Sequence, residues 1–347
     1  MATAALRLQA FRSLWGTPSA ARLGVATAPA AAYGDKLLAR IKAQGYDGIE
    51  ASLSDLELLG GARVVNELLA KHDLQLIVGV YSGWTDYEDR NLHEHFDGVS
   101  QHLDRLRRQL DLALDQYGDA SPSSSSSSSS PSRLAWINAH SGTDHWNKLD
   151  QMEYVAHALE IESELELDIL SHETHRGRLF YSPWPTLELL DAFPSLKLSL
   201  DFSHWCVVTE RLLDTEFDER WIRRVLPFVH HVHGRVGTAQ RPQIAVMPGH
   251  PAAQHEVDRF ERLWESVWAA QLARSQFAQA TERKGSRVRG GVSTFTPEYG
   301  PVPYAPRDVA NPEADGYDVD AVCELQMARQ RKQFARFLAE RTTASDA

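Results

Sequence analysis

Residues 196–205, LKLSLDFSHW, decide how the fold of this chain is interpreted, because a short run of strand character ends there in ionisable side chains. Apolar and polar residues alternate along the run, as in a half-buried strand, and Asp201 and His204 follow its last leucine. Two later segments repeat the arrangement: residues 228–237 read FVHHVHGRVG and residues 292–301 read VSTFTPEYGP. Each segment therefore places an ionisable group where a buried strand is expected to end.

Short apolar or alternating runs of this kind recur eight times along the chain. We expect strands at residues 6–14, 46–51, 74–80, 134–139, 165–172, 196–202, 228–235 and 292–298. Amphipathic patterns with helical spacing, such as residues 33–45, 62–73 and 91–118, separate them. Alternating strands and helices predict parallel strands, and eight units predict a (β/α)8 TIM barrel of the α/β class. A doubly wound sheet is the alternative, but no Gly-rich fingerprint follows the first strand.

Composition and length fit one globular domain. The 347 residues are 43% hydrophobic and 24% charged, and we expect a single domain over residues 1–347. The Ser-rich stretch at residues 120–132 has nothing to bury, so we expect a disordered surface loop there.

Two cysteines make no disulfide framework, and no apolar run reaches the ~18 residues of a membrane span. We therefore expect a cytoplasmic protein without a membrane partner.

Four consecutive predicted strands finish in acids or a histidine. These residues are Glu173, Asp201, His233 and Glu298. Three carboxylates at one barrel mouth would repel one another strongly in a medium of low dielectric constant, and a bound dication removes that cost. Carboxylate oxygens with one imidazole suit Mn, Mg, Co or Zn. The pattern therefore predicts one divalent metal ion at the C-terminal ends of the strands.

Each of these residues has a simpler interpretation when taken alone. A single acid after a strand is more often a helix N-cap or part of a surface ion pair, and Asp201 is placed to cap a short helix. Side chains alternate between the two faces of a strand, so His231 and His233 lie on the same face. One of them is then the metal ligand, and the other supports the ligands or contacts the substrate. We favour His233 as the ligand because it lies nearer the end of the strand.

The motifs resemble those of the xylose isomerase-like TIM barrels, the sugar phosphate isomerase/epimerase superfamily. The segments that carry the resemblance are GYDGIEASL (45–53), HETHRGR (172–178), LDFSHW (200–205), HVHGRVG (231–237) and TPEYGP (296–301). The resemblance implies Glu173, Asp201, His233 and Glu298 as the metal ligands and His204 as a histidine that contacts substrate. Ketose 3-epimerases carry a further Glu and a further Arg where this chain has Leu179 and Ala239.

Other side chains near the predicted strand ends are candidates for substrate binding. We assign this role to His140, Arg176, Arg178, His204, His231 and Arg235. Guanidinium groups suit carboxylates and phosphates, so the arginines indicate a small anionic or polyhydroxylated substrate; ion pairing with surface acids is the alternative. The formal net charge of −11 disfavours nucleic acid as a partner. A homo-oligomer is an expectation from the resemblance alone.

The expected chemistry is proton transfer at carbon. With a metal holding two substrate oxygens, Glu173 and Glu298 act as general base and acid through an enediolate, which gives an isomerase or epimerase of carbohydrate metabolism.

Three other functions are possible for the same residues. Loss of a hydroxyl group from the substrate at this site would make the chain a lyase acting on a polyol, an inosose or a shikimate-like acid. A third hypothesis is a metallohydrolase like endonuclease IV, with extra ligands among His140, His172, His175 and His231. A barrel that binds without catalysis is the fourth.

Overall fold

The computed structural model describes most of the chain. The described residues are 6–15, 17, 30–83, 92–118, 132–246, 253–280, 291–311 and 314–345. The expectation of a disordered Ser-rich loop falls almost entirely outside them, since residues 119–131 are not described.

Eight strands form a closed barrel in chain order, as the sequence predicted. The strands are β1 (Arg7–Ser13), β2 (Gly48–Ser52), β3 (Gln75–Tyr81), β4 (Leu134–His140), β5 (Leu170–Glu173), β6 (Leu198–Leu200), β7 (Val229–His233) and β8 (Val292–Thr296). Their described pairings are parallel, for example β2 with β3 and β7 with β8. Most strand residues are buried, which parallel strands covered by helices require.

Internal contacts divide the chain into two compact units. The N-terminal unit is Phe11–His172, and the C-terminal unit joins Met1–Ala10 to Glu173–Ala347. The division falls within β1 and within β5, so each unit contains part of both strands. β2, β3 and β4 belong to the N-terminal unit, and β6, β7 and β8 to the C-terminal unit.

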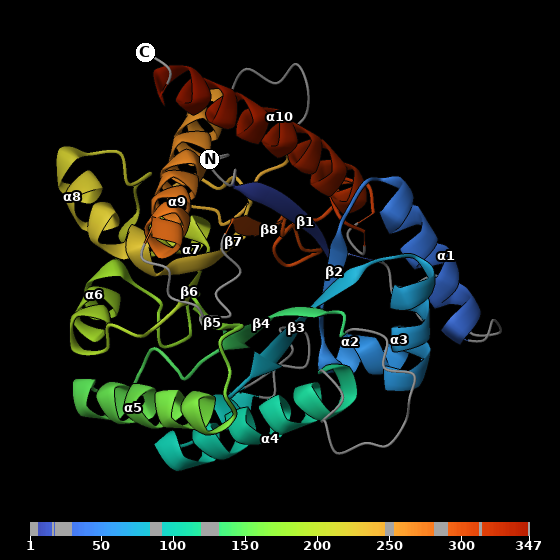
Figure 1. Cartoon of the computed structure of the whole chain (residues 1–347), viewed down its shortest axis with the longest axis horizontal. Helices are drawn as coiled ribbons and strands as arrows, with labels where there is room; N and C mark the ends of the chain where they lie inside the picture. The colour runs from blue at the N-terminus through green and yellow to red at the C-terminus, as the bar shows by residue number, and fades with distance from the viewer. Residues whose placement is uncertain are drawn as a thin grey trace. The chain divides into compact units, whose positions relative to one another are not determined.

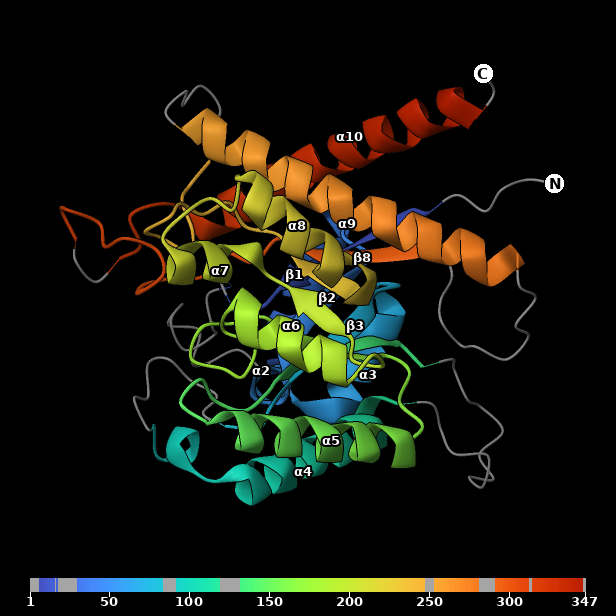
Figure 2. The ribbon, with the colours of Figure 1, turned by 90° about the vertical axis from the view of Figure 1, so that its left-hand side faces the viewer.

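Helices follow most strands. In the N-terminal unit they are α1 (Ala30–Ala43), α2 (Leu53–Leu58), α3 (Gly61–Lys71), the 3-10 helix η1 (Leu92–Phe96), α4 (Val99–Tyr117) and α5 (Lys148–Glu164). In the C-terminal unit they are α6 (Pro183–Ala192), α7 (Phe202–Thr209), α8 (Glu216–Val225), η2 (Leu226–Phe228), α9 (Gln254–Ala280) and α10 (Val319–Ser345). Helices α4 and α5 lie side by side, and so do α9 and α10 (Figures 1 and 2). None of the described helices is long and apolar enough to cross a membrane.

The largest differences from the sequence-based element boundaries are at the start of the fifth strand and in the helix before the fourth strand. The fifth strand was expected to begin at Leu165, but α5 continues to Glu164 and Leu165 is its C-cap residue. Glu166 then takes a left-handed conformation with φ of 52°, so the chain turns before β5 begins at Leu170. The long helix expected over residues 91–118 is broken, because Gly98 has an extended backbone and serves as the N-cap of α4.

Both cysteines are free and buried. Cys323 belongs to a core cluster in the C-terminal unit with Tyr299, Val319 and Val322. Cys206 is fully buried on α7, and burial raises the pKa of its thiol above the ordinary value. The cluster around Tyr299 fixes the segment just after β8, and Glu298 lies at the start of that segment.

Candidate metal centre

Four segments of the C-terminal unit end in the residues that the sequence singled out. Glu173 is the last residue of β5, and His233 is the last residue of β7. Asp201 follows β6 directly, and Glu298 lies two residues beyond β8. All four side chains are buried or nearly so. Glu298 is the most exposed of them, with 13% of its side-chain surface accessible to solvent. Ionisable groups this deeply buried require compensating partners.

Three of the four residues converge on one point. The Nδ1 atom of His233 lies 3.5 Å from Oε1 of Glu173 and 3.2 Å from Oε2 of Glu298. One ligand atom from each of the three lies within 4.8 Å of the other two. Two ligands bonded to one ion at about 2.0–2.1 Å are about 3.3–3.5 Å apart in a tetrahedron and about 3.0 Å apart in an octahedron. The observed spacings match these values, so the donor set fits a divalent ion without a large rearrangement.

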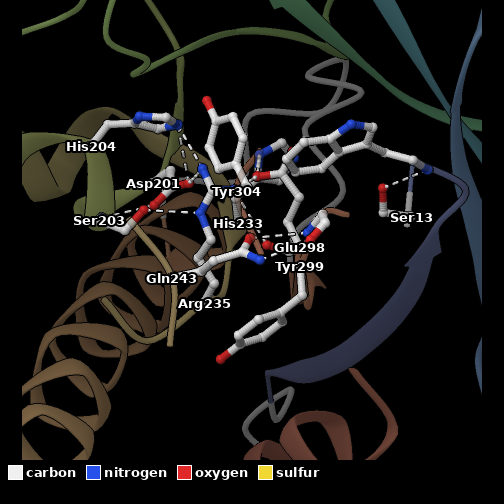
Figure 3. Close-up of polar contacts among 12 residues, drawn as sticks. Ser13, Asp201, Ser203, His204, His233, Arg235, Gln243, Glu298, Tyr299 and Tyr304 are labelled. Carbon is white, nitrogen blue, oxygen red and sulfur yellow. Dashed lines mark hydrogen bonds and ion pairs between the residues drawn. The ribbon is translucent and has the colours of Figure 1, made fainter. Parts of the chain in front are cut away.

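Asp201 uses its two oxygens differently. Oδ1 accepts a hydrogen bond from the backbone N–H of Ser203 at 2.8 Å and caps α7, which is the simpler role that the sequence left open. Oδ2 lies 2.7 Å from Nη2 of Arg235 (Figure 3). Asp201 is therefore in the same cluster of charges, but a guanidinium is its immediate partner. Whether it also serves as the fourth metal ligand stays a prediction.

Arg235 connects the acids with His204. Its Nε donates to Oγ of Ser203 at 2.9 Å, and its Nη1 lies 3.5 Å from Oε2 of Glu298 (Figure 3). Its Nη2 also donates to Nε2 of His204 at 2.6 Å. Because a guanidinium can only donate, His204 accepts at Nε2 and carries its ring proton on Nδ1. The sequence proposed Arg235 as a substrate group and did not foresee that it would bind Asp201.

Burial and neighbouring charges shift the pKa values of this cluster. Burial raises the pKa of Asp201 to about 6, against the opposing effect of Arg235. Burial, together with the charges of His175 and Arg235, lowers the pKa of His204 well below its ordinary value, so the imidazole is neutral. Burial alone would lower the pKa of Arg235, but Asp201 and Glu298 outweigh it and the guanidinium stays charged.

Carboxyl groups are concentrated in this cluster. Glu173, Asp201 and Glu298 bring three carboxyl groups into this cluster, and Arg235 is in contact with two of them, Asp201 and Glu298. A divalent cation would offset the repulsion among these carboxylates. The Oε2 atom of Glu298 is buried and makes no hydrogen bond with any residue that the structure describes. Both observations favour the metal that the sequence predicted.

The other predicted substrate residues have different surroundings. His231 points its Nδ1 at Oγ1 of Thr294 at 2.8 Å, and its Nε2 lies 3.5 Å from Oγ1 of Thr296, so β8 holds the ring. Arg178 is fully buried. His140 belongs to the N-terminal unit, where its ring stacks on that of Tyr81 at 4.2 Å. Contact with substrate remains a prediction for each of these residues.

Tyr304 is a residue of the cluster that the sequence did not single out. The guanidinium carbons of Arg176 and Arg235 lie 5.0 and 5.1 Å from its ring centroid, within the range of cation–π contacts. Its hydroxyl lies 3.3 Å from Nε2 of His175, whose ring centroid is 3.8 Å from that of His204. The only signal in the sequence was the Pro- and aromatic-rich stretch TPEYGPVPYAP, at residues 296–306.

No protein-family model and no curated protein matches the chain. Solved structures that resemble it include a xylose isomerase domain protein from Alicyclobacillus acidocaldarius, at 14% identity and TM-score 0.48, covering 96% of this chain and 100% of that one. Endonuclease IV from Thermus thermophilus follows at 13% identity and TM-score 0.45, covering 96% and 99%. A probable 3-DHS dehydratase from Bacillus anthracis has 14% identity and TM-score 0.44, covering 76% and 86%. Likenesses of this size carry no information about the reaction.

Proposed function

We propose that the chain is a divalent-metal-dependent isomerase or epimerase of a small sugar, sugar phosphate or sugar acid. The observation that supports it most is the convergence of two carboxylates from different strands on His233, at 3.5 Å for Glu173 and 3.2 Å for Glu298. Glu173, His233 and Glu298 would hold the ion, with Asp201 as the fourth ligand. An ion of Mn, Mg, Co or Zn would act there as a Lewis acid on substrate oxygens and fix their position.

Isomerisation and epimerisation both need one group that takes a proton from carbon and another that returns it. Glu298 keeps 13% of its side-chain surface exposed, whereas Glu173 keeps none. We therefore assign proton removal to Glu298 and proton return to Glu173. Return to the neighbouring carbon gives isomerisation, and return to the opposite face of the same carbon gives epimerisation.

His204 is the group best placed to bind a substrate oxygen. Its Nδ1 carries the ring proton, because Nε2 accepts from Arg235, and this buried N–H has no hydrogen-bond partner among the described residues. A neutral imidazole that donates a hydrogen bond can stabilise an oxygen that becomes negative during the reaction. Arg235 and the partly exposed Arg176 add positive charge, which favours a substrate with a carboxylate or phosphate.

Metal content is the first test. We expect protein purified without chelator to hold about one Mn, Co, Mg or Zn ion at this centre by elemental mass spectrometry, and a Glu173→Gln/Asp201→Asn variant to lose it. Glu188→Gln, an exposed acid on α6, is the matched control and should keep the ion. If the double variant keeps all of its metal, or if excess Mn and Co fail to load the native protein, the proposal is wrong.

The reaction itself is tested in deuterated water. Ketoses, sugar phosphates and sugar acids are incubated with the metal-loaded protein, and proton NMR follows exchange of a carbon-bound hydrogen and the appearance of an isomer. We expect both with at least one substrate class, and neither with Glu298→Gln. A product that absorbs in the near ultraviolet would show the lyase instead. Two or three zinc ions that are all lost in the Glu173→Gln/Asp201→Asn variant would favour the metallohydrolase.

A further inference from the structure

A second group of metal-binding side chains lies in the N-terminal unit, at the turn after β4. His95 comes from η1, and Asp144 and His145 come from the segment GTDHW at residues 142–146. One possible ligand atom from each of the three lies within 4.8 Å of the other two. None of these residues has a part in the centre described above, and their positions in the sequence, about fifty residues apart, form no recognisable motif.

The two imidazoles already point at one place. Oγ1 of Thr143 lies 3.0 Å from Nε2 of His95 and 2.8 Å from Nδ1 of His145, so a single oxygen atom contacts a nitrogen of each ring. The same Nε2 of His95 lies 3.7 Å from Oδ1 of Asp144. Neighbouring ligands of a tetrahedral zinc ion are about 3.3–3.5 Å apart, so the His95–Asp144 pair is within a few tenths of an ångström of that spacing.

The segment that carries Asp144 and His145 is firmly held. Trp146 is buried against the rings of His102 and Tyr154, at centroid distances of 4.7 and 5.3 Å. Asn147 caps α5 by accepting hydrogen bonds from two backbone N–H groups. The backbone N–H of Gly142 donates to Oγ of Ser82 at 2.7 Å. Two of the three ligands therefore stand on anchored backbone, which reduces the entropy lost when an ion binds.

Chemistry and access favour zinc. Two imidazole nitrogens and one carboxylate oxygen are ligands that zinc prefers, and three protein ligands leave the fourth position to water. Asp144 keeps 39% of its side-chain surface exposed, which gives an ion a route from solvent.

We propose that His95, Asp144 and His145 form a zinc site that is separate from the barrel-mouth centre. Zinc takes the ring nitrogens that contact the Thr143 hydroxyl, and it joins η1 to the segment after β4. The proposal does not depend on the isomerase function, because it shares no residue with the centre formed by Glu173, His233 and Glu298.

The experiment titrates zinc into a Glu173→Gln/His233→Asn variant of the full chain, in competition with a chromophoric chelator, so that only the second site is read. We expect one zinc ion per chain, and binding at least ~10-fold weaker after Asp144→Asn or His145→Asn. His157→Asn removes an exposed histidine of α5 in the same unit and should leave the affinity unchanged.

Cobalt(II) gives a second readout that does not depend on activity. Bound to two imidazoles and a carboxylate in a tetrahedral site, it should show visible absorption bands that disappear in the His145→Asn variant. Zinc binding with equal affinity in Asp144→Asn, His145→Asn and their parent would overturn the proposal. So would the absence of bound zinc at ~100 μM, a concentration well above the dissociation constants of specific sites.

Discussion

Arg235 and Arg224 both bind an aspartate at 2.7 Å in the C-terminal unit, but their surroundings are opposite. Arg235 and Asp201 are almost completely buried, with side-chain exposures of 1% and 0%. Arg224 and Asp191 have 55% and 64% of their side-chain surface exposed to solvent. Solvent screens the exposed pair, whereas loss of one partner of the buried pair leaves a charge without compensation.

The two pairs give a matched prediction. Arg235→Met should lower the free energy of unfolding by about 3–5 kcal/mol, because the Asp201 carboxylate is left buried beside other acids. Arg224→Met should cost less than about 1 kcal/mol. Urea unfolding of both variants, in the presence of a chelator, measures the difference. Similar losses of unfolding free energy in the two variants would mean that the contact between Arg235 and Asp201 does not stabilise the fold.

Sequence reasoning identified the acids and histidines of this centre but not their pairings. Glu173, Asp201 and His233 stand out because ionisable residues seldom end apolar strands, a signal that is local in the sequence. The binding of Asp201 to Arg235 depends on the distance between two side chains 34 residues apart, which no local pattern encodes. Tyr304 was missed for the same reason: its contacts with Arg176 and Arg235 arise only from the course of the chain after β8.

At the scale of the element, strands were easier to predict than their limits. All eight predicted strands are present, because each is a short apolar run between helical patterns. Their ends were less certain: β6 is only Leu198–Leu200, since Asp201 already caps the next helix. The helix predicted over 91–118 breaks before Val99, where Gly98 provides the N-cap without a side chain. Helical periodicity alone does not reveal such a break.

The N-cap of α8 tests how much one local contact contributes. Oγ1 of Thr215 accepts a hydrogen bond from the backbone N–H of Asp218, and the Asp218 side chain accepts one from the backbone N–H of Thr215. Thr215→Ala should lower the free energy of unfolding by about 1 kcal/mol, because the backbone N–H of Asp218 loses its acceptor and the Asp218 carboxylate loses the hydroxyl donor. Thr215→Ser keeps the hydroxyl and should cost only a few tenths of that. A larger loss for Ser than for Ala in thermal unfolding would contradict the capping role.

At the scale of the molecule, the two metal-binding groups belong to different compact units. Glu173, His233 and Glu298 lie in the C-terminal unit, and His95 and His145 lie in the N-terminal unit. An ion that binds the folded state stabilises it by an amount set by its concentration relative to Kd. Because each proposed ion would contact its own unit, the local protection that each ion gives can be measured separately.

Hydrogen exchange should therefore distinguish the two ions. At a Mn concentration of about 100 times Kd, binding adds about 2.7 kcal/mol of stability. Exchange should slow first in β5, β7 and β8, whose ends carry the ligands, and the Glu173→Gln/His233→Asn variant should show no such change. Zinc added to that variant should instead slow exchange in η1 and at the turn after β4, because those segments carry His95 and His145. If Mn protects the same segments in the variant as in the native chain, the ion does not bind Glu173 and His233, and the assignment of the barrel-mouth centre fails.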